Sequence, residues 1–262
     1  MGGMRRGRNI VRAATGWIAA AALAVLFAGC QEGSLAIPPA TATATPGAAP
    51  VAATVPAVPP TQAAAPARDL QASDYVLTAA PETAGFESSG GADEPDSDST
   101  AMRAEIAECV GVPGYDPPPP SDETTGDTFT NTEESEFQVF SRAKILPASQ
   151  ISQSAEIVSS PLFGDCYRGA LEEQLAGTDE NGLTYEIVAV ETPPTPRGTT
   201  ALVRTTMGIT DEYGTYGYVF DTIYFYVGQV AVELDVTNVG DVPPPDIEQG
   251  FIDQIAGKLT NQ

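Results

Sequence analysis

The stretch Tyr216-Gly217-Tyr218-Val219-Phe220-Asp221-Thr222-Ile223-Tyr224-Phe225-Tyr226-Val227 is rich in aromatic and β-branched residues, and it predicts a long β-strand. Successive side chains of a strand point to opposite faces of its sheet, so Tyr224 and Tyr226 share one face while Ile223 and Phe225 share the other. Both faces therefore carry apolar area. If helices pack on one face, the other either lines a ligand groove or is covered by a further helix.

Further strands and helices are expected around this strand. The apolar period changes from helical to two after Gly182, and Gly228 marks a tight reversal typical of an antiparallel hairpin. We expect strands at 136–142, 183–192, 200–209, 216–227 and 229–239, and helices at 101–110, 148–158, from Ser160 onward, and at 246–259. This order predicts an α+β fold, in which an antiparallel β-sheet has helices packed on it in two or three layers.

The N-terminal residues have the layout of an export signal. Four arginines between residues 5 and 12 precede an apolar run at 13–27, and the run closes with Leu26-Phe27-Ala28-Gly29-Cys30. The run is too short to span a bilayer comfortably. It resembles a bacterial lipoprotein signal, which implies removal of residues 1–29 and lipidation of Cys30; an ordinary secretory signal is the alternative. Two or three acyl chains would hold the protein on a cell membrane or outer membrane, with its domain outside the cytoplasm.

Composition divides the remainder into a linker and a domain. Residues 33–67 are nearly all Ala, Pro, Thr and Val without charge, so 30–67 is expected to be a disordered tether carrying the lipidated cysteine. Fully extended, such a tether reaches roughly 100 Å, at about 3.1 Å per residue. We place the α+β domain at 68–262, with loops at 88–100 and 113–134.

The charge of the chain limits its partners. Eight of the twelve basic residues and all thirty-five acidic residues follow residue 29, which leaves a formal charge of −27 after the signal. Such a surface repels nucleic acids and anionic headgroups. It indicates solubility or salt tolerance, or else a site for a cation or a basic partner. The chain has no histidine, so we expect no histidine-dependent catalysis, no metal and no cofactor.

Lipidation of Cys30 would leave only Cys109 and Cys166, an even pair in an oxidising compartment. We expect a disulfide between them, closing a loop of about 57 residues and stabilising the fold by about 4 kcal/mol. The alternative is a reactive thiol pair. That chemistry needs a C-x-x-C spacing or an activating base, and the sequence has neither.

Several landmarks occur in a recognisable order: residues 70–75, Cys109, residues 135–140, Cys166-Tyr167, residues 221–230 and the amphipathic segment ending at Leu259. This order resembles the extracellular sensor domain of the PknH type and the related LpqN-like lipoproteins, over roughly 70–259. The resemblance implies a fold similar to the Mog1/PsbP group and a role in sensing or binding a ligand in a groove against the sheet. It supplies no residue specific for a ligand.

Three other patterns offer weaker chemistry. Ser141 and Lys144 fit S-x-x-K, a serine hydrolase motif, but it belongs at a helix start and here follows a strand. The acidic run 93–98 could collect calcium ligands, but it lacks the glycine and terminal glutamate of an EF-hand. The pairs Glu172-Glu173 and Asp179-Glu180 are better explained as surface charge than as glycosidase carboxylates.

These observations favour a membrane-anchored extracytoplasmic lipoprotein with a non-catalytic ligand-binding or sensor-like domain. The ligand candidates are tyrosines of the central strand, for which a place in the core is the favoured interpretation: Tyr216, Tyr218, Tyr224 and Tyr226. A small apolar ligand is the first expectation. The alternatives are an envelope protein held through the acidic surface and, more remotely, a serine hydrolase.

Overall fold

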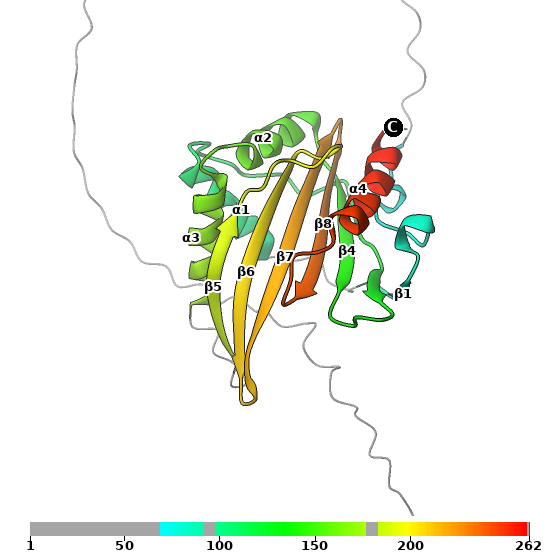
Figure 1. The fold of residues 1–262 in the computed structure, drawn as a ribbon. Helices are drawn as coiled ribbons and strands as arrows, with labels where there is room; N and C mark the ends of the chain where they lie inside the picture. Colours follow the sequence, from blue (N-terminus) through cyan, green and yellow to red (C-terminus); the bar gives the residue numbers. More distant parts are fainter. Residues whose placement is uncertain (1–68, 92–97, 177–182, 261) are drawn as a thin grey trace, which may run out of the picture. The chain divides into compact units, whose positions relative to one another are not determined.

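The computed structural model describes residues 69–91, 98–176, 183–260 and 262. The signal, the tether and the acidic run before Asp98 lie outside these ranges. The described part forms an eight-stranded antiparallel sheet with four α-helices packed against it (Figure 1). The α+β fold expected from the sequence is thereby confirmed, and the layers number three.

The sheet has the strand order β1-β3-β4-β8-β7-β6-β5, and β2 pairs with β4 beside β3. Its long strands lie within one to three residues of the ranges predicted from their period of two. The reversal at Gly228 is a two-residue turn between Val227 and Val230, and Gly228 adopts a positive φ of 59° there. The strands are β1 Phe86–Ser89, β2 Asp122–Thr125, β3 Thr128–Asn131, β4 Gln138–Ile145, β5 Thr184–Glu191, β6 Ala201–Asp211, β7 Gly214–Val227 and β8 Val230–Val239.

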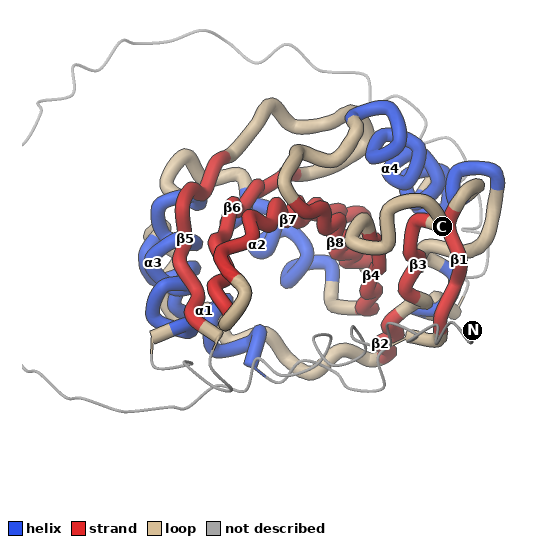
Figure 2. Tube along the Cα trace, turned by 60° about the horizontal axis from the view of Figure 1, so that its bottom comes forward, coloured by secondary structure: helices blue, strands red, loops and turns tan. Residues whose placement is uncertain are grey.

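One face of the sheet is covered by α4 (Pro245–Leu259), as Figure 2 shows from the side. The apolar spacing of four along this helix places Phe251, Ile255 and Leu259 against Ile223 and Phe225 of β7 in the larger core. Fully burying side chains of this size stabilises a fold by about 1.5–3 kcal/mol each. This face of β7 is therefore core.

The opposite face is covered in part by α1 (Asp98–Cys109), α2 (Ala148–Val158) and α3 (Phe163–Leu175). Their apolar residues form a second core with Tyr224 of β7. The structure contains the predicted disulfide, which joins Cys109 at the end of α1 to Cys166 inside α3 with a Cα–Cα distance of 5.7 Å. Cys166 is buried and Cys109 is exposed.

Two differences from the sequence prediction concern loops. The range 113–134 contains β2 and β3, and the range 88–100 holds the end of β1 and the start of α1. Both β2 and β3 have only four residues, which is too short for an alternation of apolar and polar residues to be recognised. Their pairing with β4 sets their register. Among the helices of the described ranges, none is long and apolar enough to cross a membrane.

Candidate functional site

The sheet face that carries the β7 tyrosines is divided into two regions. Near β2, β4 and β8 it bears charged side chains beneath α1, which we call the polar cluster: Arg103, Glu123, Arg142, Lys144, Glu233 and Asp235. Toward the β6–β7 turn it bears aromatic and aliphatic side chains, which we call the open strip: Tyr185, Met207, Ile209, Tyr216, Tyr218, Phe220 and Val239. Strand register places the strand residues of both sets on this face, and Arg103 reaches it from α1.

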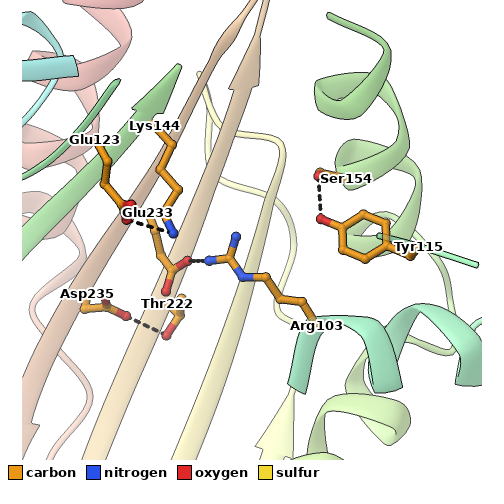
Figure 3. Close-up of polar contacts among 8 residues, drawn as sticks. All are labelled: Arg103, Tyr115, Glu123, Lys144, Ser154, Thr222, Glu233 and Asp235. Atoms are coloured by element: carbon orange, nitrogen blue, oxygen red, sulfur yellow. Dashed lines mark hydrogen bonds and ion pairs between the residues drawn. The ribbon is translucent and has the colours of Figure 1, made fainter. Parts of the chain in front are cut away.

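The polar cluster is built from ion pairs between distant segments (Figure 3). Arg103 of α1 donates through Nη2 to Oε2 of Glu233 on β8, and Lys144 Nζ lies 2.8 Å from Oε1 of Glu123 on the neighbouring strand β2. Each pair is about one fifth exposed, so water screens it less than a surface ion pair. These contacts tie α1 and β2 to the middle of the sheet.

Asp235 lies beside these pairs and accepts a 2.8 Å hydrogen bond from the Thr222 hydroxyl across the β7–β8 pair. Burial, and secondly the negative charge of Glu233, raise the pKa of Asp235 to about 7. The Thr222 hydrogen bond and the charges of Arg142 and Arg103 act in the opposite direction. Asp235 therefore exchanges its proton near neutral pH, and the cluster gains positive charge as the pH falls.

The replacement Asp235→Asn should make the protein more stable at pH 8 by up to about 4 kcal/mol, because the rise in the pKa of Asp235 from 3.8 to about 7 is about three pKa units at about 1.4 kcal/mol each. A raised carboxyl pKa means that the folded state binds the proton more tightly, so stability falls as the pH rises from about 4 to about 7. Asparagine keeps the acceptor for Thr222 without this titration. Urea unfolding at pH 5 and pH 8 measures the difference, and an unchanged pH slope in the variant would contradict the assignment.

The polar cluster borders a partly open pocket of about 10 Å³, which is room for about one water molecule. Arg103, Arg142, Lys144, Tyr226 and Glu233 line it together with Ala231 and Val232. The cluster thus positions α1 over the sheet and offers proton exchange at Asp235, and it gives no nucleophile a base.

The tyrosines expected as ligand candidates lie on one face but in different surroundings. Tyr224 is buried against Phe163 of α3, with ring centroids 5.9 Å apart, and its ring stacks on Tyr226 at 6.2 Å. Burial raises the pKa of both phenols, so they stay neutral. Tyr216 is 44% exposed and Tyr218 is half-buried. The helices therefore cover one pair of tyrosines and leave the other pair at the surface.

The open strip continues from Tyr216 along β7 and across its neighbours. Tyr218 stacks on Phe220 with ring centroids 5.9 Å apart, and it pairs across the strands with Met207 of β6 and Val239 of β8. Figure 1 shows that the far ends of β6 and β7 run past the ends of α1 and α3. Within this half of the face Tyr216 is exposed, Tyr218 and Phe220 are half-buried and Met207 is buried, so the aromatic rings of β7 are the part that another molecule can contact.

The weaker motifs do not assemble into catalytic sites. Ser141 is fully buried, and its Oγ accepts a 2.7 Å hydrogen bond from the Leu77 amide. Lys144 is three positions along the same strand, so it points to the opposite face and cannot act as a base for Ser141. Glu172 pairs with Arg168 on the surface of α3. The candidate pair Asp179-Glu180, the acidic run 93–97 and Cys30 lie outside the described residues.

Sequence reasoning missed the polar cluster. Arg103 and Glu233 are separated by 130 positions, and neither belongs to a motif. In the parts of the chain that the structure describes, no group of three or more Cys, Asp or Glu side chains could hold a metal ion. The useful signal was the alternation along β7, which placed the tyrosines on one face without showing which of them the helices cover.

Comparison with known proteins identifies a distant structural similarity and no family. No family model matches the chain, and no curated protein matches it. Among solved structures, the chain is similar to the cyanobacterial PsbP protein CyanoP from Synechocystis sp. PCC 6803, at 9% identity and a TM-score of 0.31, over 55% of this chain and 75% of that one. At this TM-score the similarity carries no statement about ligand, partner or location.

Proposed function

We propose that the protein is an extracytoplasmic lipoprotein, anchored through Cys30, whose domain binds or senses a target without transforming it. The open strip is the observation that carries this proposal. Its exposed Tyr216 and half-buried Tyr218 and Phe220 lie side by side on a sheet face that the helices leave uncovered. A partly exposed aromatic surface suits binding. The resemblance to PknH-type and LpqN-like sensor domains points the same way.

Membrane attachment rests on the signal and is tested apart from binding. In the variant Cys30→Ala, incorporation of clickable palmitate should fall to background, and the protein should leave the membrane fraction, because the proposed acyl chains are its only anchor. Labelling of intact cells followed by fractionation measures both results. A variant that stays in the membrane fraction at the level of the native protein would contradict the lipid anchor.

Binding is tested on the protein purified from its own membranes. Native mass spectrometry should detect a bound molecule that is lost in the double variant Tyr216→Ala/Tyr218→Ala. The double variant Tyr216→Phe/Tyr218→Phe keeps the rings and serves as the control that retains it. If wild type carries nothing, and extracts of the envelope supply nothing that binds, the ligand-binding role fails.

A second candidate function is docking of an envelope protein. It is favoured by the carboxylates beside the open strip, since Glu136 and Asp211 are among the groups that act on Tyr218. Burial first, and then these two negative charges, raise the pKa of the Tyr218 phenol. A surface that is both aromatic and acidic suits a basic protein segment better than an apolar small molecule.

A further inference from the structure

The open strip has a defined composition across four strands. Tyr216 and Tyr218 of β7 pair with Ile209 and Met207 of β6, and the strip extends to Tyr185 of β5. Tyr218 pairs on its other side with Val239 of β8. None of these side chains is charged, so the surface itself supplies π-faces and aliphatic contacts. It supplies no cation.

Carboxylates stand beside these rings. Glu136 precedes β4 and is exposed, and its Oε2 accepts a hydrogen bond from the neighbouring Ser135 hydroxyl. Asp211 ends β6 at the turn, where its Oδ1 accepts the amides of Tyr213 and Gly214 at 2.7 and 3.0 Å. Both charges act on the Tyr218 phenol. The rings and the carboxylates thus belong to one surface.

Six of the seven basic side chains in the described ranges have identified partners away from the open strip. Their ion pairs and hydrogen bonds lie in the polar cluster, on the surface of α3 and around α4: Arg103 with Glu233, Lys144 with Glu123, Arg168 with Glu172, Arg197 with Asp253, Arg204 with Asp221 and Lys258 with the Val76 carbonyl. None of these six contacts involves Glu136 or Asp211, so these six cations do not neutralise the carboxylates beside the open strip.

We propose that the open strip docks an extended, arginine- or lysine-bearing segment of a partner protein, with its cations over the Tyr216 and Tyr218 rings and beside Glu136 and Asp211. This inference rests on the proposed binding role of the strip and names the chemistry of its target. A cation over an aromatic face is attracted by the ring quadrupole, and arginine also stacks its planar group on the ring. The formal charge of −27 after the signal steers such a segment toward the domain.

The test uses the purified full-length mature protein in a nonionic detergent. The probe is a twelve-residue peptide of alternating arginine and serine with one terminal tryptophan. Because Trp17 is the only tryptophan of the chain and lies in the signal, the fluorescence anisotropy of the peptide is free of protein signal. The titration is run at about 0.15 M salt, where the Debye length is about 8 Å and long-range attraction is weak.

Three double variants separate the strip from general charge. Tyr216→Leu/Tyr218→Leu should weaken peptide binding about tenfold, whereas Tyr216→Phe/Tyr218→Phe should stay within about twofold of wild type, because the ring faces carry the interaction. Glu136→Gln/Asp211→Asn should weaken binding about fivefold to tenfold. Glutamine and asparagine keep the acceptors for Ser135 and for the turn amides. Thermal unfolding checks that each variant is folded.

The matched control is Glu108→Gln/Glu156→Gln, which removes the same two charges from exposed positions on α1 and α2. It should leave peptide binding within about twofold of wild type. Equal weakening by this pair and by Glu136→Gln/Asp211→Asn would mean nonspecific attraction to an acidic protein and would overturn the inference. So would an absence of binding at about 1 mM peptide.

Failure of this inference is distinguishable from failure of the proposed function. If the arginine peptide does not bind, but a small molecule copurifies with wild type and is lost in Tyr216→Leu/Tyr218→Leu, the strip binds a ligand of another chemistry. The cationic segment is then excluded and the binding role stands. If neither peptide nor copurifying molecule depends on these two tyrosines, both proposals fall.

Discussion

Replacing Arg204 with leucine should lower the free energy of unfolding by about 3–5 kcal/mol at pH 7. Arg204 on β6 donates through Nε to Oδ1 of Asp221 at 2.7 Å and through Nη2 to Oδ2 at 2.5 Å, across the β6–β7 pair. Asp221 is 0% exposed, beneath α4. Leucine would leave this carboxylate buried without its counter-charge, and breaking a buried ion pair on one side has a cost of this size. Urea unfolding measures it.

The loss of stability in Arg204→Leu should depend on pH because the carboxyl group of Glu248 on α4 interacts with both Asp221 and Arg204. Burial, and then the hydrogen bond with Asp221 and its charge, raise the pKa of Glu248 to about 8, while Arg204 acts in the opposite direction. Without Arg204, two carboxyl groups face each other with no cation between them. The deficit should therefore be smallest near pH 5, where Glu248 is protonated, and should grow toward pH 9 as Glu248 becomes charged.

The control for this prediction is the double variant Arg204→Leu/Asp221→Leu. Replacing both partners of a buried ion pair by apolar residues is often close to neutral, so the double variant should regain most of the lost stability. Arg204→Lys keeps the charge without the two-point geometry and should fall between wild type and Arg204→Leu. A deficit below about 1 kcal/mol at pH 7 would show that Arg204 and Asp221 behave as a solvent-screened surface pair.

The long elements could be predicted from the sequence because their periods are local. In β7 the alternation of aromatic and β-branched residues predicted a strand at 216–227, and the structure extends it only to Gly214. In α4 the spacing of Ile247, Phe251, Ile255 and Leu259 predicted a helix at 246–259. The helix in the structure begins one residue earlier, at Pro245. Such patterns are read within one segment, so no tertiary information is needed.

The short strands β2 and β3 could not be predicted, because their conformation depends on residues that are distant in the sequence. Asp122–Thr125 and Thr128–Asn131 hold no alternation of their own, and pairing with β4 decides their conformation. The same limit applies to the candidate site. Alternation placed Tyr216 and Tyr224 on one face, but only the position of α3 decides that Tyr224 is buried and Tyr216 is exposed. A local pattern gives the face of a strand, and a distant helix gives its accessibility.

This dependence on distant packing gives the helix layer a specific role in shaping the site. The helices α1 and α3 end the covered half of the face, and they are joined to each other by the disulfide and to the sheet by the pair of Arg103 with Glu233. The hydrophobic contacts of Ile106 and Phe163 complete the attachment. The boundary between the covered face and the open strip is therefore held by three independent kinds of contact.

Removing the disulfide should have the second large effect. The double variant Cys109→Ala/Cys166→Ala should lose about 2–4 kcal/mol of unfolding free energy, because the bridge spans 57 positions and restricts the unfolded chain. The circular dichroism spectrum of the folded protein should change little, since Ile106 and Phe163 still pack in the same core. Urea unfolding at pH 7 measures the loss.

Reduction of the wild-type protein provides the matched control for this variant. It breaks the same bond without changing a side chain, and the exposure of Cys109 gives a reductant access to the bridge. Reduced wild type and the double variant should therefore unfold at similar urea concentrations. If the double variant loses less than about 1 kcal/mol of unfolding free energy while reduction of wild type costs several, the destabilisation on reduction comes from the free thiols and not from the missing bond. A small loss in both would mean that the unfolded chain keeps residues 109 and 166 close without the bond, as residual structure can. A loss of the expected size in both would show that the bridge stabilises the fold by restricting the unfolded chain. This stabilisation also favours the folded state, in which α1 and α3 lie above the sheet.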